Sequence, residues 1–258
     1  EGVRPAILSA LDPSIADARP VQQRRYKRNS NYAAKVEEID KLLRVGFIRP
    51  VKRATWLSPI VVVTKKNEQI RVCIDYRKLN ATIITNAFPL SFTNGVLQEV
   101  AGHERYSFLD RFNGYNQIHM HLDDQEKTTF VTEWGVSVVV IMMFGLTTAP
   151  TTFQRIIMEI CDDYILAFMQ VFLDDFAVCG QQIKHLDSYA SALVIVDKLG
   201  KSKPREIAFY ISSGTLLGHI ISHEGISMDP EKVQAILNAP TPTPTTTKAL
   251  SQFLRQIR

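Results

Sequence analysis

The chain has 258 residues, of which 45% are hydrophobic and 22% are charged, and its formal net charge is +4. This composition supports a sizeable folded core and excludes wholesale disorder. No run approaches 18 consecutive apolar residues and no signal peptide opens the chain, so we expect an intracellular protein, cytoplasmic or nuclear, with no membrane partner. The three cysteines, Cys73, Cys161 and Cys179, lack metal-site spacing, which predicts reduced structural thiols.

A basic stretch, RPVQQRRYKR at 19–28, ends the irregular region expected at the N-terminus. It holds five basic residues and no acid, with Tyr26 among them. This pattern favours contact with a phosphate backbone, while a solvated, flexible arm explains the composition equally well.

Periodicity predicts the next elements. Apolar residues at helical spacing predict a helix that begins near residue 31 and ends at Gly46. A Val-rich strand and an alternating strand, joined by a polar turn at 66–69, predict a β-hairpin over 59–77.

The middle of the chain predicts three strands and a helix. The strands are expected at 105–110, 115–122 and 137–144. The helix is expected at 149–168, where Pro150 marks its start.

The last third predicts two helices around one strand. We expect a helix near 184–199, a strand at 215–222, and a helix at 229–239 with Asp229 as its N-cap. The repeat of Pro and Thr at 240–247 predicts an extended linker. This mixture of strands and helices indicates an α+β protein, and the missing phosphate-loop motif excludes a P-loop enzyme.

Two adjacent acids, Asp174 and Asp175, are enclosed by apolar residues in QVFLDDFAVCG, residues 170–180. A buried carboxylate is unfavourable by several kcal/mol unless it is paired, protonated or bound to a cation. Because neighbouring carboxylates repel each other, a divalent cation is the natural way to keep both ionised. The alternative is a polar turn that joins two strands.

The chain contains two other adjacent aspartate pairs for comparison. Asp123–Asp124 lies among charged residues and is expected in a solvated loop, whereas Asp162–Asp163 is expected to face water from a helix. A further acid, Asp110, ends a strand that we expect beside the strand near residue 174, antiparallel to it. Three carboxylates on adjacent strand ends would hold two Mg²⁺ ions for phosphoryl transfer.

Eight motifs follow one another in the chain: KVEEIDKLLRVGFIRPV, WLSPIVVVTKKN, RVCIDYRKLN, YSFLDRFNGYNQI, KTTFVTEWG, FGLTTAPTTFQR, VFLDDF and LLGHIISHEGISMDPEKVQAI. In this order, over residues 26–258, they resemble the reverse transcriptase region of a gypsy-type (Metaviridae) LTR retrotransposon Pol polyprotein, of the plant kind. The resemblance implies a right-hand polymerase of fingers, palm and thumb, with an antiparallel palm sheet and helices on one face. It also implies an RNA-directed DNA polymerase, a nucleotidyltransferase that adds a dNTP to a primer on an RNA or DNA template.

The resemblance implies a catalytic role for three aspartates and a nucleotide-binding role for two basic residues. Asp110, Asp174 and Asp175 match the metal-binding triad, which in the family holds two Mg²⁺ ions that Mn²⁺ replaces. Lys65 and Arg71 match the basic fingers hairpin that closes on the triphosphate, and a solvated hairpin turn is the alternative.

Other positions match the family's nucleotide, template and primer contacts. Tyr115 matches the aromatic under the sugar that blocks a 2′-hydroxyl, and a core aromatic is its alternative. Phe144 and Gly145 match the segment beside the incoming nucleotide. Gln154 matches a helix position near the template, and residues 216–219 match the element that grips the primer end.

The same resemblance divides the chain into five regions. They are a basic arm at 1–30, fingers at 31–100, a palm at 101–213 that includes a fingers portion at 120–150, a primer-grip strand and thumb start at 214–239, and a linker with a truncated connection segment at 240–258.

The chain also departs from the family pattern. Met143 replaces a usual proline, residues 91–93 interrupt a usual Leu-Pro-Phe, and Glu206 stands in a shortened 200–209 segment where a lysine is expected. No ribonuclease H, integrase or protease sequence follows, so we expect a fragment or a truncated relic, placed in virus-like particles if the element is intact. A catalytically dead remnant and an Asp-rich metal-dependent phosphatase are the alternatives, and the Glu206 departure predicts weak or absent polymerase activity.

Overall fold

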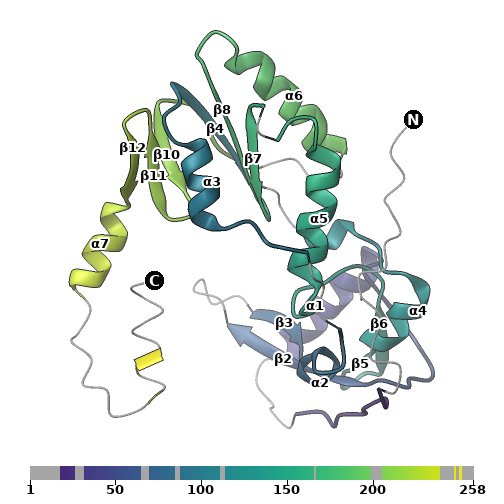
Figure 1. Cartoon of the computed structure of the whole chain (residues 1–258). Helices are drawn as coiled ribbons and strands as arrows, with labels where there is room; N and C mark the ends of the chain where they lie inside the picture. Colours follow the sequence, from purple (N-terminus) through teal and green to yellow (C-terminus); the bar gives the residue numbers. More distant parts are fainter. Residues whose placement is uncertain are drawn as a thin grey trace. The chain divides into compact units, whose positions relative to one another are not determined.

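The computed structural model describes residues 18–26, 32–64, 70–84, 88–110, 114–165, 167–198, 205–238, 247 and 250–251. The chain divides into two compact units, each built from three separate segments (Figure 1). Unit 1 comprises Glu1–Leu90, Arg111–Asp163 and Leu193–Arg205, and unit 2 comprises Ser91–Asp110, Tyr164–Ala192 and Glu206–Arg258. Within the described ranges, no helix is both long and apolar enough to span a bilayer.

Unit 1 is built on a five-stranded sheet with the strand order β1-β6-β5-β2-β3. Its elements are α1 (Tyr32–Arg44), β1 (Ile48–Pro50), β2 (Ser58–Thr64), β3 (Ile70–Ile74), α2 (Arg77–Asn80), η1 (Gly114–Gln117), α4 (Leu122–Gln125), η2 (Glu126–Thr128), β5 (Phe130–Val131), β6 (Val136–Val139) and α5 (Ala149–Cys161). The predicted hairpin is confirmed, because β2 and β3 pair antiparallel with Val62 opposite Val72.

The end of α1 follows directly from the sequence. Gly46 adopts a left-handed φ of 76°, which glycine accepts without a steric penalty. The amides of Gly46 and Phe47 donate to the carbonyls of Leu43 and Leu42, the two hydrogen bonds of a Schellman motif. The predicted helix stop at Gly46 is therefore confirmed.

Unit 2 contains a four-stranded sheet, ordered β7-β8-β4-β9, and a three-stranded sheet, ordered β10-β11-β12. Its elements are α3 (Thr93–Val100), β4 (Arg105–Asp110), β7 (Met169–Phe172), β8 (Asp175–Gly180), β9 (Arg205–Ile211), β10 (Ser213–Leu216), β11 (His219–Ser222), β12 (Gly225–Met228) and α7 (Pro230–Leu237), with α6 (His185–Lys198) and β9 crossing the unit boundary. In Figure 1, β10, β11 and β12 lie side by side and lead into α7.

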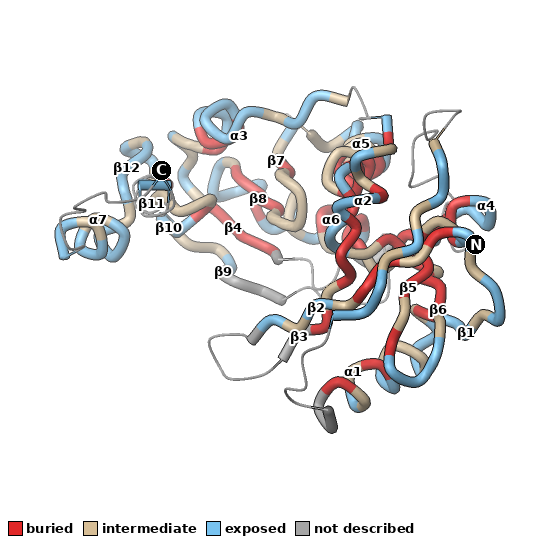
Figure 2. The backbone as a smooth tube through the Cα atoms, turned by 90° about the horizontal axis from the view of Figure 1, so that it is seen from below, coloured by how far each residue is buried: buried red, intermediate tan, exposed pale blue. Residues whose placement is uncertain are grey.

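The core of unit 2 lies around β4 and β8, which are mostly buried in Figure 2. Tyr106 and Phe108 of β4 pack with Val96 and Val100 of α3 and with Ala177 of β8. Burial on both faces explains why β8 carries the continuous apolar run 176–179. By contrast, the described part of α7 buries no residue.

The strand predicted at 115–122 is wrong. The segment forms η1, then a short bridge in which His119 is opposite Ile141, and then α4. Its alternating pattern arises because Tyr115, Ile118 and Met120 are buried, not because a regular ladder forms.

The solvated loop predicted for Asp123–Asp124 is also wrong. Both residues lie in the first turn of α4, where negative charge is favourable. Asp123 is exposed, but Asp124 is buried and its carboxylate lies 3.0 Å from the Lys127 ammonium. Asp162 and Asp163 face water at the end of α5, as predicted.

The strand predicted at 215–222 is two strands. Leu217 and Gly218 both have left-handed φ angles, 49° and 75°, and reverse the chain between β10 and β11. The strand predicted at 137–144 is shorter, since β6 ends at Val139, and the helix predicted at 149–168 ends at Cys161. The helix near 184–199 is confirmed as α6, and Asp229 caps α7 by accepting from the Glu231 amide at 3.0 Å.

Candidate functional site

The two enclosed acids lie at the tip of the β7–β8 hairpin. Phe172 pairs with Asp175, so Leu173 and Asp174 form the two-residue turn. Leu173 has a left-handed φ of 53°, a conformation that costs a bulky residue about 1–3 kcal/mol. Asp174 and Asp175 are each half-buried.

The adjacent strand brings a third acid to the same end of the sheet. In the antiparallel β4–β8 pair, Asp110 is directly opposite Asp175, a position that places the two Cα atoms about 4.5–5.5 Å apart. The predicted hairpin and the predicted antiparallel neighbours are confirmed. Three carboxylate residues thus meet where β4 ends and β8 begins, and oxygen donors of this kind are the ligands that Mg²⁺ prefers.

The side chain of Asp110 lies outside the described part of the structure. Among the side chains that are described, no three metal-ligating residues gather in one place. The register therefore supports the position of the triad, and the triad as a ligand set stays a prediction. Lys65 also lies outside the described residues, and of Arg71 only the backbone is described, opposite Val63.

Tyr115 and Phe144, two of the predicted nucleotide contacts, lie together in unit 1. The Tyr115 ring is 4.7 Å from the Phe144 ring and 4.8 Å from the Phe153 ring, measured between centroids. Tyr115 is 4% exposed and Phe153 is fully buried, whereas Phe144 is 54% exposed. Phe144 therefore lies on the solvent side of the Tyr115 ring.

Gly145 follows Phe144 in a turn that another residue holds in place. Its φ is 107°, which side chains rarely adopt. The Asn80 amide donates to the Gly145 carbonyl at 2.7 Å and accepts from the Thr147 amide at 3.1 Å. Asn80 was not predicted from the sequence, although an asparagine that ends a short helix is a signal for side chain to backbone bonds.

Gln154, the predicted template contact, lies in the buried part of α5. It is 1% exposed, on the same helix as Phe153. This burial does not fit direct contact with a template in the present conformation, and the prediction stays untested.

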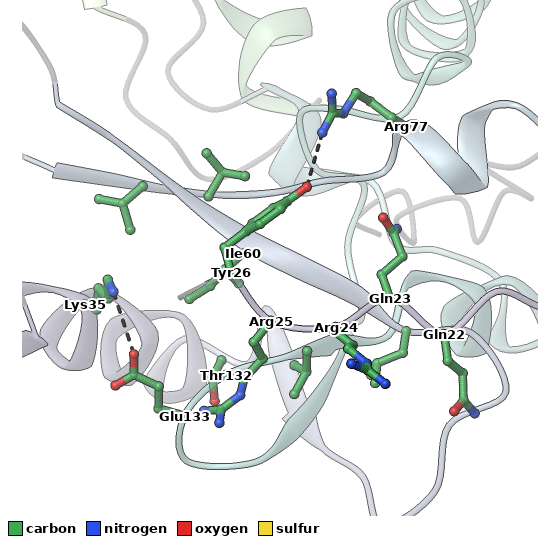
Figure 3. Close-up of a pocket in the computed structure, with 14 residues that line it drawn as sticks. Gln22, Gln23, Arg24, Arg25, Tyr26, Lys35, Ile60, Arg77, Thr132 and Glu133 are labelled. Atoms are coloured by element: carbon green, nitrogen blue, oxygen red, sulfur yellow. Dashed lines mark hydrogen bonds and ion pairs between the residues drawn. The ribbon is translucent and has the colours of Figure 1, made fainter. Parts of the chain in front are cut away.

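A basic cavity of about 1570 Å³ lies in unit 1, between residues 22–26, β2 and residues 131–133 (Figure 3). Arg24, Arg25, Lys35 and Arg77 line it. Lys35 is 3.8 Å from Glu133. Among the described residues, no carboxylate pairs with Arg24 or Arg25.

The basic stretch is tied to the sheet of unit 1 rather than free. The Gln23 amide donates to the Leu57 carbonyl at 2.8 Å, and the Leu57 amide donates to the Val21 carbonyl at 3.1 Å. The alternative of a flexible arm is therefore wrong for residues 21–23 and Tyr26, whereas Arg24 and Arg25 are exposed to solvent. The physical reason is that these residues extend the hydrogen bonding of the chain that enters β2.

Tyr26 anchors the same stretch through a polar cluster that the sequence did not reveal. Its hydroxyl donates to the Asp75 carboxylate at 2.7 Å, and Arg77 holds that carboxylate with bonds of 2.6 and 2.8 Å. The Arg77 hydrogen bonds, and after them the Tyr26 hydroxyl, hold the pKa of Asp75 well below its usual range, although burial opposes the shift. The signal that was available is an aspartate directly after an alternating strand.

Unit 2 contains a buried polar cluster of hydrogen bonds around Ser107 of β4. His185 is 1% exposed, and its Nε2 lies 2.8 Å from the Ser107 hydroxyl. The Tyr210 amide donates to the same hydroxyl at 3.0 Å, so the cluster links β4, α6 and β9. Burial, and after it the Arg105 charge, lowers the pKa of His185.

Comparison with known proteins places this geometry in a family. The model of the family described as "Reverse transcriptase (RNA-dependent DNA polymerase)" matches residues 63–208. The Pol polyprotein of the transposon opus from Drosophila melanogaster is 32% identical over 243 residues, which are 91% of this chain and 24% of that protein. The Pol polyprotein of the Drosophila transposon gypsy is 32% identical over 238 residues, 88% of this chain and 23% of that protein.

Solved structures share the fold. A foamy viral protease–reverse transcriptase in complex with double-stranded DNA aligns with a TM-score of 0.84 and 23% identity, covering 99% of this chain and 44% of that one. The same kind of protein in complex with an RNA/DNA hybrid aligns with a TM-score of 0.81 and 23% identity, covering 96% of this chain and 33% of that one. These alignments support the right-hand polymerase fold.

The chain spans about a quarter of the length of the curated relatives it matches. Those relatives come from a fly and a fission yeast, so the expected plant kind of element has no support. The gypsy type itself is confirmed by the transposon relatives. Because the family model matches more than half of the 258 residues, this chain belongs to the reverse transcriptase family.

Proposed function

We propose that this chain is the fingers and palm of an RNA-directed DNA polymerase from an LTR retrotransposon. The observation that carries the proposal is the register of unit 2, with Asp110 opposite Asp175 and Asp174 in the turn between strands. Family membership supports the same activity and implies dependence on a divalent metal. The phosphatase and dead-remnant alternatives are not favoured by these findings.

The proposed reaction joins a nucleotide to a primer. The primer 3′-hydroxyl oxygen attacks the α-phosphorus of a dNTP, the bond to the bridging β-phosphate oxygen breaks, and pyrophosphate leaves as the hydroxyl proton is lost. When bound, two Mg²⁺ ions, or Mn²⁺ in their place, supply charge stabilisation to the attacking and leaving oxygens. Asp110, Asp174 and Asp175 would hold them, and the carboxylate oxygens present fit such ions.

The nucleotide contacts follow from the family match. Lys65 and Arg71 contact the triphosphate, and Tyr115 excludes a 2′-hydroxyl from below the sugar. Phe144 and Gly145 line the nucleotide position, and the contact of the Phe144 ring with Tyr115 in unit 1 supports a shared role for these two residues. Gln154 is proposed to lie on the template side. Residues 216–219, which include the Leu217–Gly218 turn, are proposed to contact the primer.

Template and primer strands would be held largely through phosphates. Arg24 and Arg25 are exposed, unpaired by any described carboxylate, and held on the sheet by the Tyr26 anchor. Cations without an internal partner gain most from phosphate contact, because nothing in the protein competes for them. An RNA or DNA template fits this surface, since phosphates carry little sequence information.

The proposal keeps the five expected regions. Residues 31–100 are assigned to fingers and 101–213 to palm, with the fingers portion at 120–150. Residues 214–239 are the primer grip and thumb start, and the flanking regions are the arm and the linker.

Primer extension on an RNA template with Mg²⁺ or Mn²⁺ tests the proposal. Asp174→Asn should abolish extension and leave primer–template affinity within about twofold, because it removes a metal ligand and no phosphate contact. The matched control is Asp163→Asn, which changes an exposed aspartate of the pair that ends α5. Equal extension by Asp174→Asn and the parent would contradict the site.

A phosphatase assay separates the remaining alternatives. The parent is tested on p-nitrophenyl phosphate under the same metal conditions. Hydrolysis without extension would favour the small-molecule alternative, and primer–template binding without either activity would favour the remnant.

A further inference from the structure

Asn80 closes the turn that carries Phe144. Its side chain donates to the carbonyl of Gly145 and accepts from the amide of Thr147, so one amide group bridges both sides of the turn. Asn80 itself is fixed at the end of α2, where its backbone amide donates to the Tyr76 carbonyl at 2.7 Å. The turn is therefore connected through Asn80 to the core of unit 1, because Tyr76 is almost fully buried.

The Phe144 ring depends on this turn for its position. Phe144 is 54% exposed, so packing restrains it mainly from one side, by the Tyr115 ring at 4.7 Å. Tyr115 is restrained from the other side by the buried ring of Phe153 at 4.8 Å. A shift of the turn would therefore move Phe144 relative to Tyr115, while Phe153 would keep Tyr115 in place.

We propose that Asn80 is a positioning residue for sugar selection, acting through Gly145 and Phe144 on access to the Tyr115 ring. This inference rests on the proposed function, in which Tyr115 excludes the 2′-hydroxyl. The role requires an amide, because the side chain must donate to a carbonyl and accept from an N–H at the same time. Aspartate retains only the acceptor, and leucine retains neither.

The conformation of Gly145 explains why the turn needs an external clamp. Its φ of 107° is held in a region that few residues favour. A Cβ at this position would lie 3.5 Å from both the Ile74 carbonyl oxygen and the Tyr76 ring, an ordinary contact distance. Close packing at Gly145 therefore does not fix its conformation, and the turn is restrained by the buried Leu146 side chain and by the two Asn80 hydrogen bonds.

The experiment measures nucleotide selectivity without turnover. The parent, Asn80→Leu and Asn80→Asp are bound to an RNA template with a dideoxy-terminated primer, and the affinities for the matched dNTP and rNTP are measured with Mg²⁺. We expect Asn80→Leu to lower the dNTP-to-rNTP affinity ratio about three- to tenfold, the factor that corresponds to one lost hydrogen bond. Asn80→Asp should have a smaller effect, and primer–template affinity should stay unchanged.

A second measurement follows the turn itself. Hydrogen exchange at the Thr147 amide should quicken in Asn80→Leu and stay protected in Asn80→Asp, which retains the acceptor. The matched control is Thr82→Val, which removes only a local hydrogen bond of 2.7 Å to the Leu79 carbonyl and should change neither readout.

Tyr115→Val distinguishes failure of the inference from failure of the proposed function. If it lowers selectivity while Asn80→Leu does not, the positioning role is overturned and the proposed function stands. If the parent forms no ternary complex with a dNTP, or if Tyr115→Val leaves selectivity unchanged, the sugar-selecting site is overturned and the role of Asn80 falls with it.

Discussion

The buried side chain of His185 ties the stability of unit 2 to pH. Because burial lowers the pKa of His185, the folded chain binds fewer protons than the unfolded chain at mildly acidic pH. Stability should therefore fall as the pH drops below about 6.5, by up to about 1.4 kcal/mol per pH unit until the folded-state pKa is reached. Urea denaturation of the parent and of His185→Gln between pH 7.5 and 5 measures this difference.

The exposed His223 provides the control for that experiment. His223→Gln should leave the slope of stability against pH as it is in the parent, whereas His185→Gln should flatten it. An equal slope in the parent and in His185→Gln would mean that the buried ring does not govern the pH response.

Glu206 is a residue outside the aspartate triad on which the rate should depend. A lysine there, as the family pattern has, would donate a proton as pyrophosphate leaves, and general-acid help of this kind is worth about 10²–10⁴-fold in rate. An anionic glutamate offers no proton at neutral pH and repels the triphosphate. We expect weak extension by the parent and a faster rate in Glu206→Lys, measured by single-nucleotide incorporation.

A charge control is needed, because any added lysine strengthens binding to nucleic acid. Glu224→Lys makes the same charge change at an exposed position in the β11–β12 turn. Fast extension by the parent, unchanged in Glu206→Lys, would show that residues 200–209 are misaligned with the family.

At the scale of elements, the docked arm predicts a salt dependence. Arg24→Gln and Arg25→Gln should each lower the slope of log affinity against log salt by about one, because each loses one phosphate contact. The control is Lys41→Gln, whose ammonium already lies 3.5 Å from Glu37 and 3.7 Å from Glu38. Fluorescence anisotropy of a labelled primer–template over a salt series measures the slopes, and equal slopes in all variants would exclude the arm from the interface.

The β10–β11 turn predicts a position where alanine is not tolerated. Gly218 has a φ of 75°, and a Cβ there would collide with the side chain of Lys232. Gly218→Ala should destabilise the protein by about 1 kcal/mol or more, because alanine disfavours the left-handed φ and the end of the Lys232 side chain must also move. Thermal melting of Gly218→Ala and of Gly95→Ala tests this expectation.

Gly95 is the matched control because it lies within α3 with open space where its Cβ would be. Alanine should raise stability there by about 0.5–1 kcal/mol. A melting temperature for Gly218→Ala at or above that of the parent would contradict the left-handed conformation of Gly218.

The elements also show what sequence patterns can and cannot give. The β2–β3 hairpin, the α1 stop at Gly46 and the α7 cap at Asp229 were predictable because each has a local cause within a few residues. The chain reversal at Leu217 was not predictable. Leucine disfavours a φ of 49°, and the two strands that the turn joins hold it in this conformation.

The same distinction applies to the site across the whole molecule. The place of Asp110 beside the hairpin tip was predictable, because Asp110 ends one apolar strand and Asp174–Asp175 interrupt another apolar run, but the register that puts Asp110 opposite Asp175 was not predicted. The cluster of Tyr26, Asp75 and Arg77 and the clamp of Asn80 on Gly145 join residues far apart in the chain. Such contacts leave no periodic signal, so only the folded chain reveals them.

The division into two units has a consequence for any fragment of the chain. Each unit is assembled from three segments, and the chain passes between the units repeatedly. A fragment that ends at residue 163 would keep β4 but lack β8 and β9, its two neighbours in the sheet. Forms truncated in this way should therefore fail to bury the core of unit 2.

The docking of the arm also sets an order of events during synthesis. Residues 21–26 are made first, but their partners Leu57, Asp75 and Arg77 come later in the chain. At about 5–20 residues per second, the arm is synthesised several seconds before those partners. During that interval Arg24 and Arg25 have no sheet to lie on.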